Sequence, residues 1–100
     1  MRLQACALVL FLAAVAAARA GPIESGREVY ERYCTSCHGI DGRPVLPGTP
    51  DFTRGDTLMK TDQQLMNAIR FGVNSMPGFD QTIDNKGLID VLFYIRTLQR

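Results

Sequence analysis

The residues best suited to carry chemistry lie together in the segment Cys34-Thr35-Ser36-Cys37-His38. Two thiols three positions apart, followed at once by an imidazole, fit a redox-active disulfide, part of a zinc site, or a covalently attached haem. A zinc site needs four ligands, but His38 is the only histidine of the chain and Cys6 its only other cysteine. A thioredoxin-like motif calls for a preceding strand, whereas the pattern before Cys34 is helical.

The spacing Cys-x-x-Cys-His is the attachment signature of c-type haem. Two thiols one helical turn apart can each form a thioether with one of the two porphyrin vinyl groups, and the next residue then lies under the iron. We therefore predict that Cys34 and Cys37 anchor a haem and that His38 is its proximal iron ligand. An incidental disulfide, common in exported proteins, is the remaining alternative.

A methionine is the predicted second axial ligand, because His38 is unique and two-histidine ligation within one chain is impossible. Met66 falls on a predicted helix, where a thioether usually fills core space. Met76 precedes Pro77, which holds it in an extended conformation, so that its side chain projects from a stiffened loop. We predict Met76 as the ligand, with Met59 as the next choice and simple burial of Met76 as the alternative.

The first twenty residues have the layout of a secretory signal peptide: Arg2, an apolar run from Ala5 to Ala18, and a small-x-small sequence ending at Ala20. The apolar run is shorter than the roughly 20 residues that a spanning helix needs. We predict cleavage after Ala20, with an uncleaved anchor as the alternative, one domain over residues 21–100, and export to the periplasm.

Removal of this segment leaves nine basic residues against ten acidic ones, a formal charge of −1. Binding to nucleic acid would call for a basic stripe, which is absent from the sequence. So small a domain often relies on a disulfide, a metal or another staple. A large apolar cofactor would serve this purpose better than a disulfide across a three-residue spacing, which closes a trivial loop.

Helical patterns cover residues 25–34, 61–71 and 85–99, with Ser25, Thr61 and Asp84 as the expected N-caps. Glycine and proline punctuate residues 39–56, and residues 72–82 are again irregular. A structureless stretch as long as 39–56 is uncommon in a small domain and usually functional. The pattern predicts an all-α fold in which this loop wraps a bound group.

The chain resembles the small bacterial class I cytochromes c over residues 21–100. The likeness lies in four segments: GREVYERYCTSCHG, TPDF, NSMPGF and LIDVLFYIRTL. It implies the cytochrome c fold, three or more helices wrapped around one covalently bound haem.

The resemblance also implies specific contacts. The Pro50 carbonyl would accept a hydrogen bond from His38, with Pro44 and Pro47 as rivals in the same loop. Gly26 and Tyr30 would cross the last helix near Val91 and Tyr94.

His38 and Met76 together would fill both axial positions, which argues against catalysis and predicts a one-electron carrier. The expected partners are redox proteins: a dehydrogenase or quinol-oxidising complex as donor, and a terminal oxidase or reductase as acceptor. A dedicated haem subunit of a larger respiratory or dehydrogenase complex is the alternative function, and a haem-based sensor is a third. Membrane association is expected only through partners or an uncleaved signal.

The polar and apolar surroundings of the haem can also be assigned from the sequence. Ile40 and Val45 are expected on the rim where electrons leave. Arg54, Lys60 and Arg70 are the candidates to pair with the haem propionates, with full solvation of their charges as the alternative.

Overall fold

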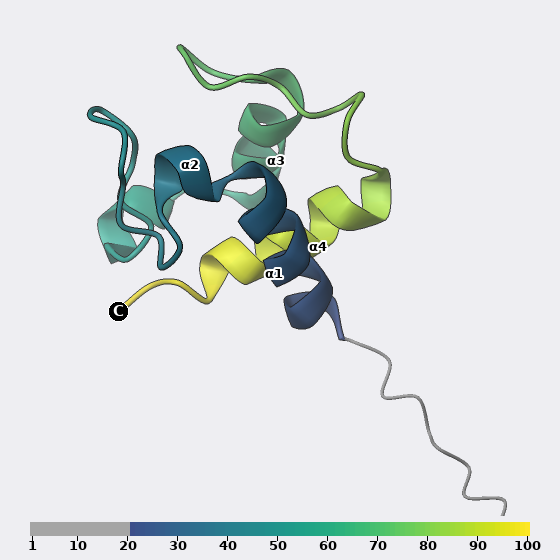
Figure 1. Cartoon of the computed structure of the whole chain (residues 1–100), viewed down its shortest axis with the longest axis horizontal. Coiled ribbons are helices and arrows are strands. Elements are labelled where there is room, and N and C mark those ends of the chain that lie inside the picture. The colour runs from purple at the N-terminus through teal and green to yellow at the C-terminus, as the bar shows by residue number, and fades with distance from the viewer. Residues whose placement is uncertain (1–20) are drawn as a thin grey trace, which may run out of the picture.

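The computed structural model describes residues 21–100, which contain four α-helices and one short 3-10 helix (Figure 1). They are α1 (Pro22–Tyr33), α2 (Thr35–His38), η1 (Gly55–Leu58), α3 (Asp62–Phe71) and α4 (Asn85–Arg96). Extended pairing within this range is one isolated bridge between Val73 and Met76. The all-α prediction is confirmed. The proposed signal peptide lies outside the described residues, and no helix among those described is long and apolar enough to cross a membrane.

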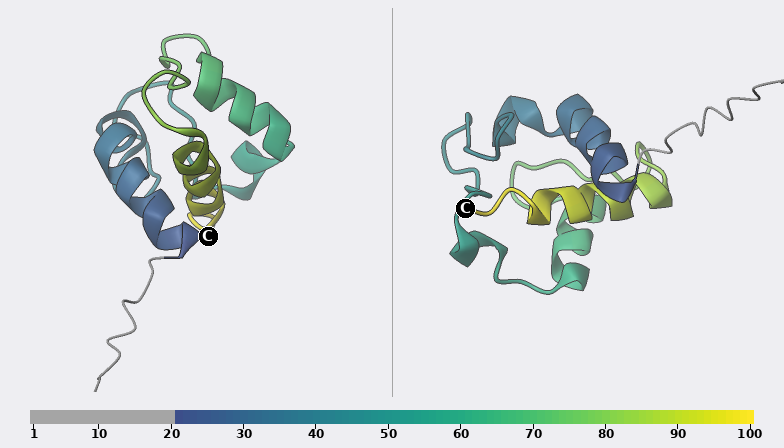
Figure 2. Two further views of the ribbon diagram at one scale, coloured as in Figure 1. Left: turned by 90° about the vertical axis from the view of Figure 1, so that its right-hand side faces the viewer. Right: turned by 90° about the horizontal axis from the view of Figure 1, so that it is seen from below.

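The first and last helices of the domain pack directly against each other (Figure 2). Their closest approach is at Gly26, where an added Cβ would lie 2.1 Å from the Asp90 carbonyl oxygen and 2.8 Å from Tyr94 Cβ. One turn further along α1, the ring of the fully buried Tyr30 packs on Tyr94 with ring centroids 5.2 Å apart. The crossing predicted from the resemblance is therefore confirmed, and it explains a glycine in the first half of a helix.

The buried core lies where α3 and α1 meet α4 and where the loop after α2 closes over them. Its members are Tyr30, Phe52, Leu58, Ile69, Ile83, Leu88, Val91 and Ile95. Cys34, Met76 and Phe79 pack against this core and are half-buried. Two of the predicted site residues, Cys34 and Met76, therefore border the core.

Two of the three predicted N-caps are confirmed. Thr61 and Gln64 form a reciprocal capping box at the start of α3, and the Asp84 side chain accepts a hydrogen bond from the Gly87 N–H at 2.7 Å. The prediction of Ser25 is wrong: α1 begins at Pro22, and the Ser25 N–H already donates to the Gly21 carbonyl at 3.0 Å. Proline at the first helical position has a preset φ and no N–H to satisfy, so the helix starts there.

The segment 39–56 is irregular as predicted, although η1 begins at Gly55 within it. Its backbone is tied to the rest of the domain at several points. The N–H groups of Val45 and Leu46 both donate to the Cys37 carbonyl, and the Arg100 N–H donates to the Thr53 carbonyl. The loop therefore returns to the end of α2 and also holds the last residue of the chain.

Arg96 connects α4 to the segment between η1 and α3. Its guanidinium donates to the Leu58 carbonyl at 2.6 Å, to the Lys60 carbonyl at 2.7 Å and to the Asp62 carboxylate at 2.8 Å. Because a guanidinium presents several donors in one plane, a single side chain satisfies all three acceptors.

We expect Arg96→Ala to lower the free energy of unfolding by about 2 kcal/mol, because three hydrogen bonds from one charged donor, including that to the partly buried Leu58 carbonyl, are lost together. Arg96→Lys should recover less than half of the loss, since an ammonium cannot reproduce the planar fork. Denaturant titration of the two variants tests this. Equal stability of Arg96→Ala and the natural chain would show that the three contacts contribute nothing net.

Candidate haem-binding site

The cysteine motif occupies a helical turn that starts where α1 ends. Cys34 closes α1, and its carbonyl accepts hydrogen bonds from the Cys37 N–H at 3.3 Å and from the His38 N–H at 2.9 Å. This turn places Cys34 and Cys37 one helical turn apart. Both cysteines are half-buried free thiols, and both line the same cavity as His38.

That cavity has a volume of about 450 Å³, within the range of roughly 300–1,000 Å³ that is usual for small-molecule and cofactor sites. Its walls come from α1, α2, the loop 46–60, α3, the loop 73–79 and α4. The predicted residues Cys34, Cys37, His38, Pro50 and Met76 all line it. Further apolar walls are formed by Tyr33, Leu46, Phe52, Leu65, Ala68, Ile69, Phe79, Leu92 and Ile95.

The His38 ring is buried, stacks on Phe52 and is neutral. It stacks on Phe52 with ring centroids 4.3 Å apart and an interplanar angle of 12°, and it is 7% exposed. Burial lowers the pKa of His38, while the nearby Pro50 carbonyl raises it to a smaller extent. The carbonyl stands outside full hydrogen-bond geometry, and buried Nδ1 has no hydrogen-bond partner among residues 21–100. A neutral imidazole is the form that binds a metal.

The backbone at the end of α2 is fixed by Tyr30. Its hydroxyl donates to the Gly39 carbonyl at 2.6 Å, and burial raises the pKa of Tyr30, so the hydroxyl keeps its proton at neutral pH. Gly39 has φ 77°, and a Cβ there would lie 1.9 Å from the Arg43 carbonyl oxygen. A glycine is thus required where the chain turns directly after His38.

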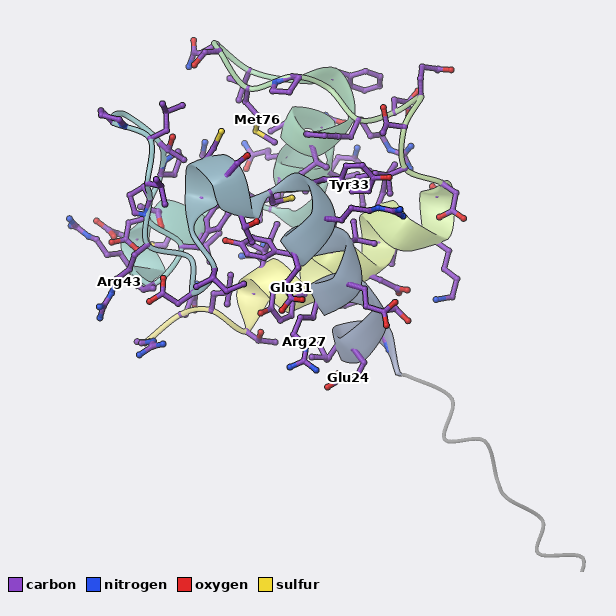
Figure 3. The ribbon with its side chains drawn as sticks, viewed as in Figure 1. Glu24, Arg27, Glu31, Tyr33, Arg43 and Met76 are labelled. Atoms are coloured by element: carbon purple, nitrogen blue, oxygen red, sulfur yellow. The ribbon has the colours of Figure 1, made fainter. Side chains whose placement is uncertain are left out.

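Met76 is presented by a tight turn between α3 and α4. The Val73 and Met76 backbones exchange hydrogen bonds of 3.1 Å and 2.9 Å around Asn74, whose φ is 51°. Beyond the turn, the Phe79 N–H donates to the Ile69 carbonyl at 2.9 Å, which ties the segment to α3. The half-buried Met76 side chain points from this loop toward the interior of the domain (Figure 3).

The other two methionines occupy different environments. Met59 is 83% exposed, and neither it nor Met66 lines the cavity. Met66 instead packs against the core. Of the three candidates in the described chain, Met76 is therefore the one that shares a cavity with His38.

The thiol environment differs from that of a redox-active cysteine pair. Burial, with a smaller contribution from neighbouring Cys37, raises the pKa of Cys34 to about 11. Redox-active thiols instead have a lowered pKa, because the thiolate is the nucleophile. Within residues 21–100, no three side chains of the types His, Cys, Asp and Glu gather in a way that could hold a metal ion.

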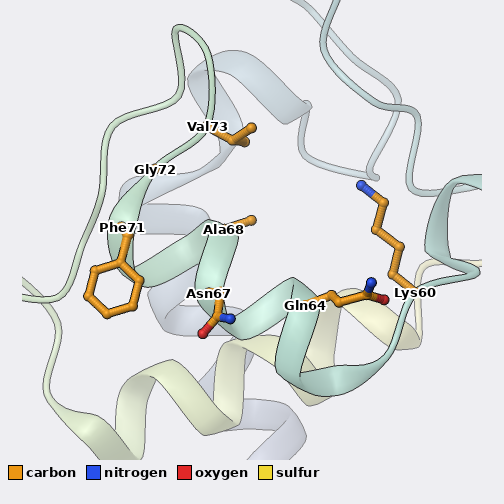
Figure 4. Close-up of a pocket in the computed structure, with 7 residues that line it drawn as sticks. All are labelled: Lys60, Gln64, Asn67, Ala68, Phe71, Gly72 and Val73. Atoms are coloured by element: carbon orange, nitrogen blue, oxygen red, sulfur yellow. The ribbon is translucent and has the colours of Figure 1, made fainter.

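A second, more open hollow runs along α3 (Figure 4). It is lined by Lys60, Gln64, Asn67, Ala68, Phe71, Gly72 and Val73. Three of these residues, Lys60, Ala68 and Val73, also line the cavity that contains the cysteines. The hollow is therefore an outer extension beside that cavity.

A protein-family model described as "Cytochrome C oxidase, cbb3-type, subunit III" matches residues 21–95. The chain belongs to this cytochrome c family. Membership implies a covalently bound haem c and a role in electron transfer. It thus supports the haem among the three chemistries considered for the cysteine motif.

Two curated cytochromes c6 and one solved structure resemble this cytochrome c domain. Cytochrome c6 of Limnospira maxima is 28% identical over 82 residues, which cover 75% of this chain and 91% of that protein. Chloroplastic cytochrome c6 of Arabidopsis thaliana is 28% identical over 67 residues, or 65% of this chain, which spans 38% of the length of that relative. The structure, KustC0563 c-type cytochrome, has a TM-score of 0.71 at 21% identity and covers 75% of this chain and 98% of its own. It supports the fold.

The residues present fit a haem of the cytochrome c family. The cavity is walled mainly by apolar side chains, as the porphyrin requires. A buried neutral imidazole and a half-buried thioether, the two donor types that suit haem iron, both line it. The two thiols needed for attachment stand beside them.

Sequence reasoning missed Phe52, whose ring stacks on His38. An aromatic residue within a loop otherwise rich in glycine and proline was the available signal, because a large apolar side chain in such a loop needs a place to be buried. No signal in the sequence marked Tyr33, the last residue of α1, as part of a cavity wall. It lines the cavity and faces Phe79 with ring centroids 6.0 Å apart.

Proposed function

We propose that this cytochrome c domain is a periplasmic one-electron carrier that holds one haem c by His/Met axial ligation. The proposal assigns thioether bonds to Cys34 and Cys37 and axial coordination to His38 and Met76. The observation that carries it is a single cavity lined by all four side chains. The family match supports the haem and the electron-transfer role.

Each of the residues that would hold the haem has a defined task in this proposal. The haem iron, when bound, supplies reversible one-electron exchange. Cys34 and Cys37 would hold the cofactor covalently, and stacking on Phe52 would keep the His38 ring in one orientation. The hydrogen-bonded turn at Val73–Met76 would hold the thioether opposite. Ligands held rigidly on both sides reorganise little when the charge changes, which suits rapid electron transfer.

The Pro50 carbonyl would act on the iron through His38. A backbone acceptor for the imidazole N–H fixes the ring orientation and raises its basicity as a ligand. The Pro50 carbonyl raises the pKa of His38, which supports Pro50 over Pro44 and Pro47 as this acceptor. Pro47 and Pro50 line the cavity, whereas Pro44 does not.

With both axial positions filled by side chains, a substrate would find no free position on the iron, so we propose that the protein is not an enzyme. Redox proteins are the expected partners. Ile40 and Val45 are 64% and 68% exposed, and Leu46 is 46% exposed and also lines the cavity. As exposed apolar side chains of the segment that follows the cysteine motif, these residues are the candidates for a transient docking surface.

Absorption spectra of the protein, made in cells that attach c-type haem, test the proposal directly. We expect a haem spectrum that changes on reduction and, in the oxidised form, the long-wavelength band of sulfur-to-iron ligation. A colourless protein would overturn the haem assignment.

Recovery from the periplasmic fraction with Gly21 as the N-terminal residue would support export and cleavage, and a retained N-terminus in the cytoplasmic fraction would contradict both.

The Cys37→Ala variant tests double attachment. Because one thioether would remain at most, we expect its pyridine haemochrome spectrum to shift relative to the natural protein. Ser36→Ala is the matched control, since Ser36 lies on the same helical turn and lines the same cavity without a role in attachment. An unshifted Cys37→Ala spectrum would contradict a bond to this cysteine.

A second candidate function is that of a dedicated haem subunit of a larger respiratory or dehydrogenase complex. Two large apolar side chains one turn apart on α4, Ile89 and Phe93, are 40% and 49% exposed, which favours a lasting protein contact. The native mass of the protein extracted under mild conditions separates the candidates. A single-chain mass supports the free carrier, and stable co-purification with other subunits supports the second candidate.

A further inference from the structure

Lys60 is the one lysine, arginine, aspartate or glutamate among the residues that line the haem cavity. The other polar side chains in its walls are mainly neutral hydroxyls and an amide, from Ser36, Thr49, Thr57, Asn74 and Ser75. Lys60 thus places a positive charge at the edge of a cavity whose other lining residues include no lysine, arginine, aspartate or glutamate.

The other two basic residues suggested by the sequence already have partners. Arg54 pairs with Asp56 at 3.0 Å, and Arg70 pairs with Asp80 at 2.8 Å. Neither arginine lines the cavity. The Lys60 side chain is exposed to solvent, and among the described residues its ammonium forms no ion pair.

The backbone that carries Lys60 is fixed from two sides. Its carbonyl accepts the 2.7 Å hydrogen bond from Arg96, and the capping box of Thr61 and Gln64 starts α3 immediately afterwards. From this position the side chain extends into the hollow beside α3 (Figure 4). A flexible side chain on a fixed backbone position can reach a ligand while losing little backbone entropy.

The proposed haem would bring two carboxylates to this cavity. In haem the propionates are on the side of the macrocycle opposite the vinyl groups, so they would point away from Cys34 and Cys37 and would need a polar edge. Thr57 is poorly available as a donor there, because its hydroxyl hydrogen-bonds to the Arg54 carbonyl at 2.7 Å and to the Asp51 carbonyl. A cation is the stronger partner for a carboxylate.

We propose that Lys60 binds a haem propionate and that its charge raises the reduction potential of the iron. This inference rests on the proposed haem site. A positive charge near the iron disfavours the ferric state, which carries one more positive charge than the ferrous state. The ammonium also offsets the field of the ionised propionate, which by itself would stabilise the ferric state.

The test compares the midpoint potentials of the haem-loaded natural protein, Lys60→Gln and Arg54→Gln. Both variants lose one positive charge, but Arg54 is paired with Asp56 outside the cavity. We expect a downward shift in Lys60→Gln that exceeds the shift in Arg54→Gln and is largely restored in Lys60→Arg. The difference should shrink at high salt, because the ammonium is exposed.

Redox-difference infrared spectra supply a readout that a merely structural change would not reproduce. The propionate carboxylate bands should move in Lys60→Gln and stay unchanged in Arg54→Gln. Equal potentials and equal carboxylate bands in the two haem-loaded variants would overturn the role of Lys60 while leaving the haem site intact. Failure of the natural protein to carry haem would overturn the proposed function and the inference with it.

Discussion

Met76→Ala is expected to abolish the long-wavelength sulfur-to-iron absorption band and to lower the midpoint potential. Thioether ligation favours ferrous iron, so its loss stabilises the ferric state. We expect a decrease on the order of 0.1–0.3 V, a fraction of the roughly 0.8 V range over which axial ligands set haem potentials. Spectroelectrochemical titration of the haem-loaded variant measures both effects.

The matched controls are Met59→Ala and Met66→Ala. Met59 is 83% exposed and Met66 packs on the core outside the cavity, so both variants should keep the band and a potential close to that of the natural protein. If Met76→Ala retained the band and either control lost it, the iron ligand would be reassigned to the methionine whose replacement removed the band.

Gly26→Ala is expected to lower the free energy of unfolding by about 3 kcal/mol, at the upper end of the usual cost of overpacking. The new Cβ would meet the Asp90 carbonyl oxygen at 2.1 Å, and backbone atoms cannot move aside as a side chain can. Alanine is intrinsically the better helix former by about 1 kcal/mol. The sign of the change therefore reports whether the contact between α1 and α4 or the propensity dominates.

Gly55→Ala is the control for Gly26→Ala. A Cβ at Gly55 would have open space around it, so the stability should change by less than about 0.5 kcal/mol. Denaturant titration of both haem-loaded variants makes the comparison. A Gly26→Ala variant as stable as the natural protein would show that the two helices can separate without cost.

Local signals in the sequence predicted most helix boundaries correctly. Thr61 and Asp84 cap their helices because a side chain three residues before a free N–H satisfies it without help from the rest of the fold. The prediction of Ser25 as N-cap was wrong because the helix begins three residues earlier, at Pro22, and proline is favoured at the first helical position. The predicted last helix, residues 85–99, ends earlier, at Arg96.

Contacts between distant segments could not be predicted in the same way. Nothing near Arg96 in the sequence indicates that it bridges the Leu58 and Lys60 carbonyls. Likewise, Arg54, Lys60 and Arg70 are equivalent in sequence, and the fold distinguishes them by pairing the two arginines with nearby carboxylates. Tertiary placement thus decides which charge faces the cavity.

The candidate site was more predictable than its supporting walls. Cys34, Cys37 and His38 form a contiguous motif whose spacing has chemical meaning, and Met76 was indicated by the proline that follows it. Phe52 is marked only by being a large aromatic residue in a loop rich in glycine and proline, and Tyr33 has no local marker, because an aromatic wall is defined by the surfaces that meet across a cavity.

The contact of α1 with α4 has a consequence for how the polypeptide acquires its structure. The segments that form this interface stand at opposite ends of the described chain, so the interface has high contact order and requires closure of nearly the whole chain as a loop. A chain still emerging from the ribosome lacks α4 and therefore lacks the partner surface of α1. We expect stable folding to begin only after synthesis of the final helix.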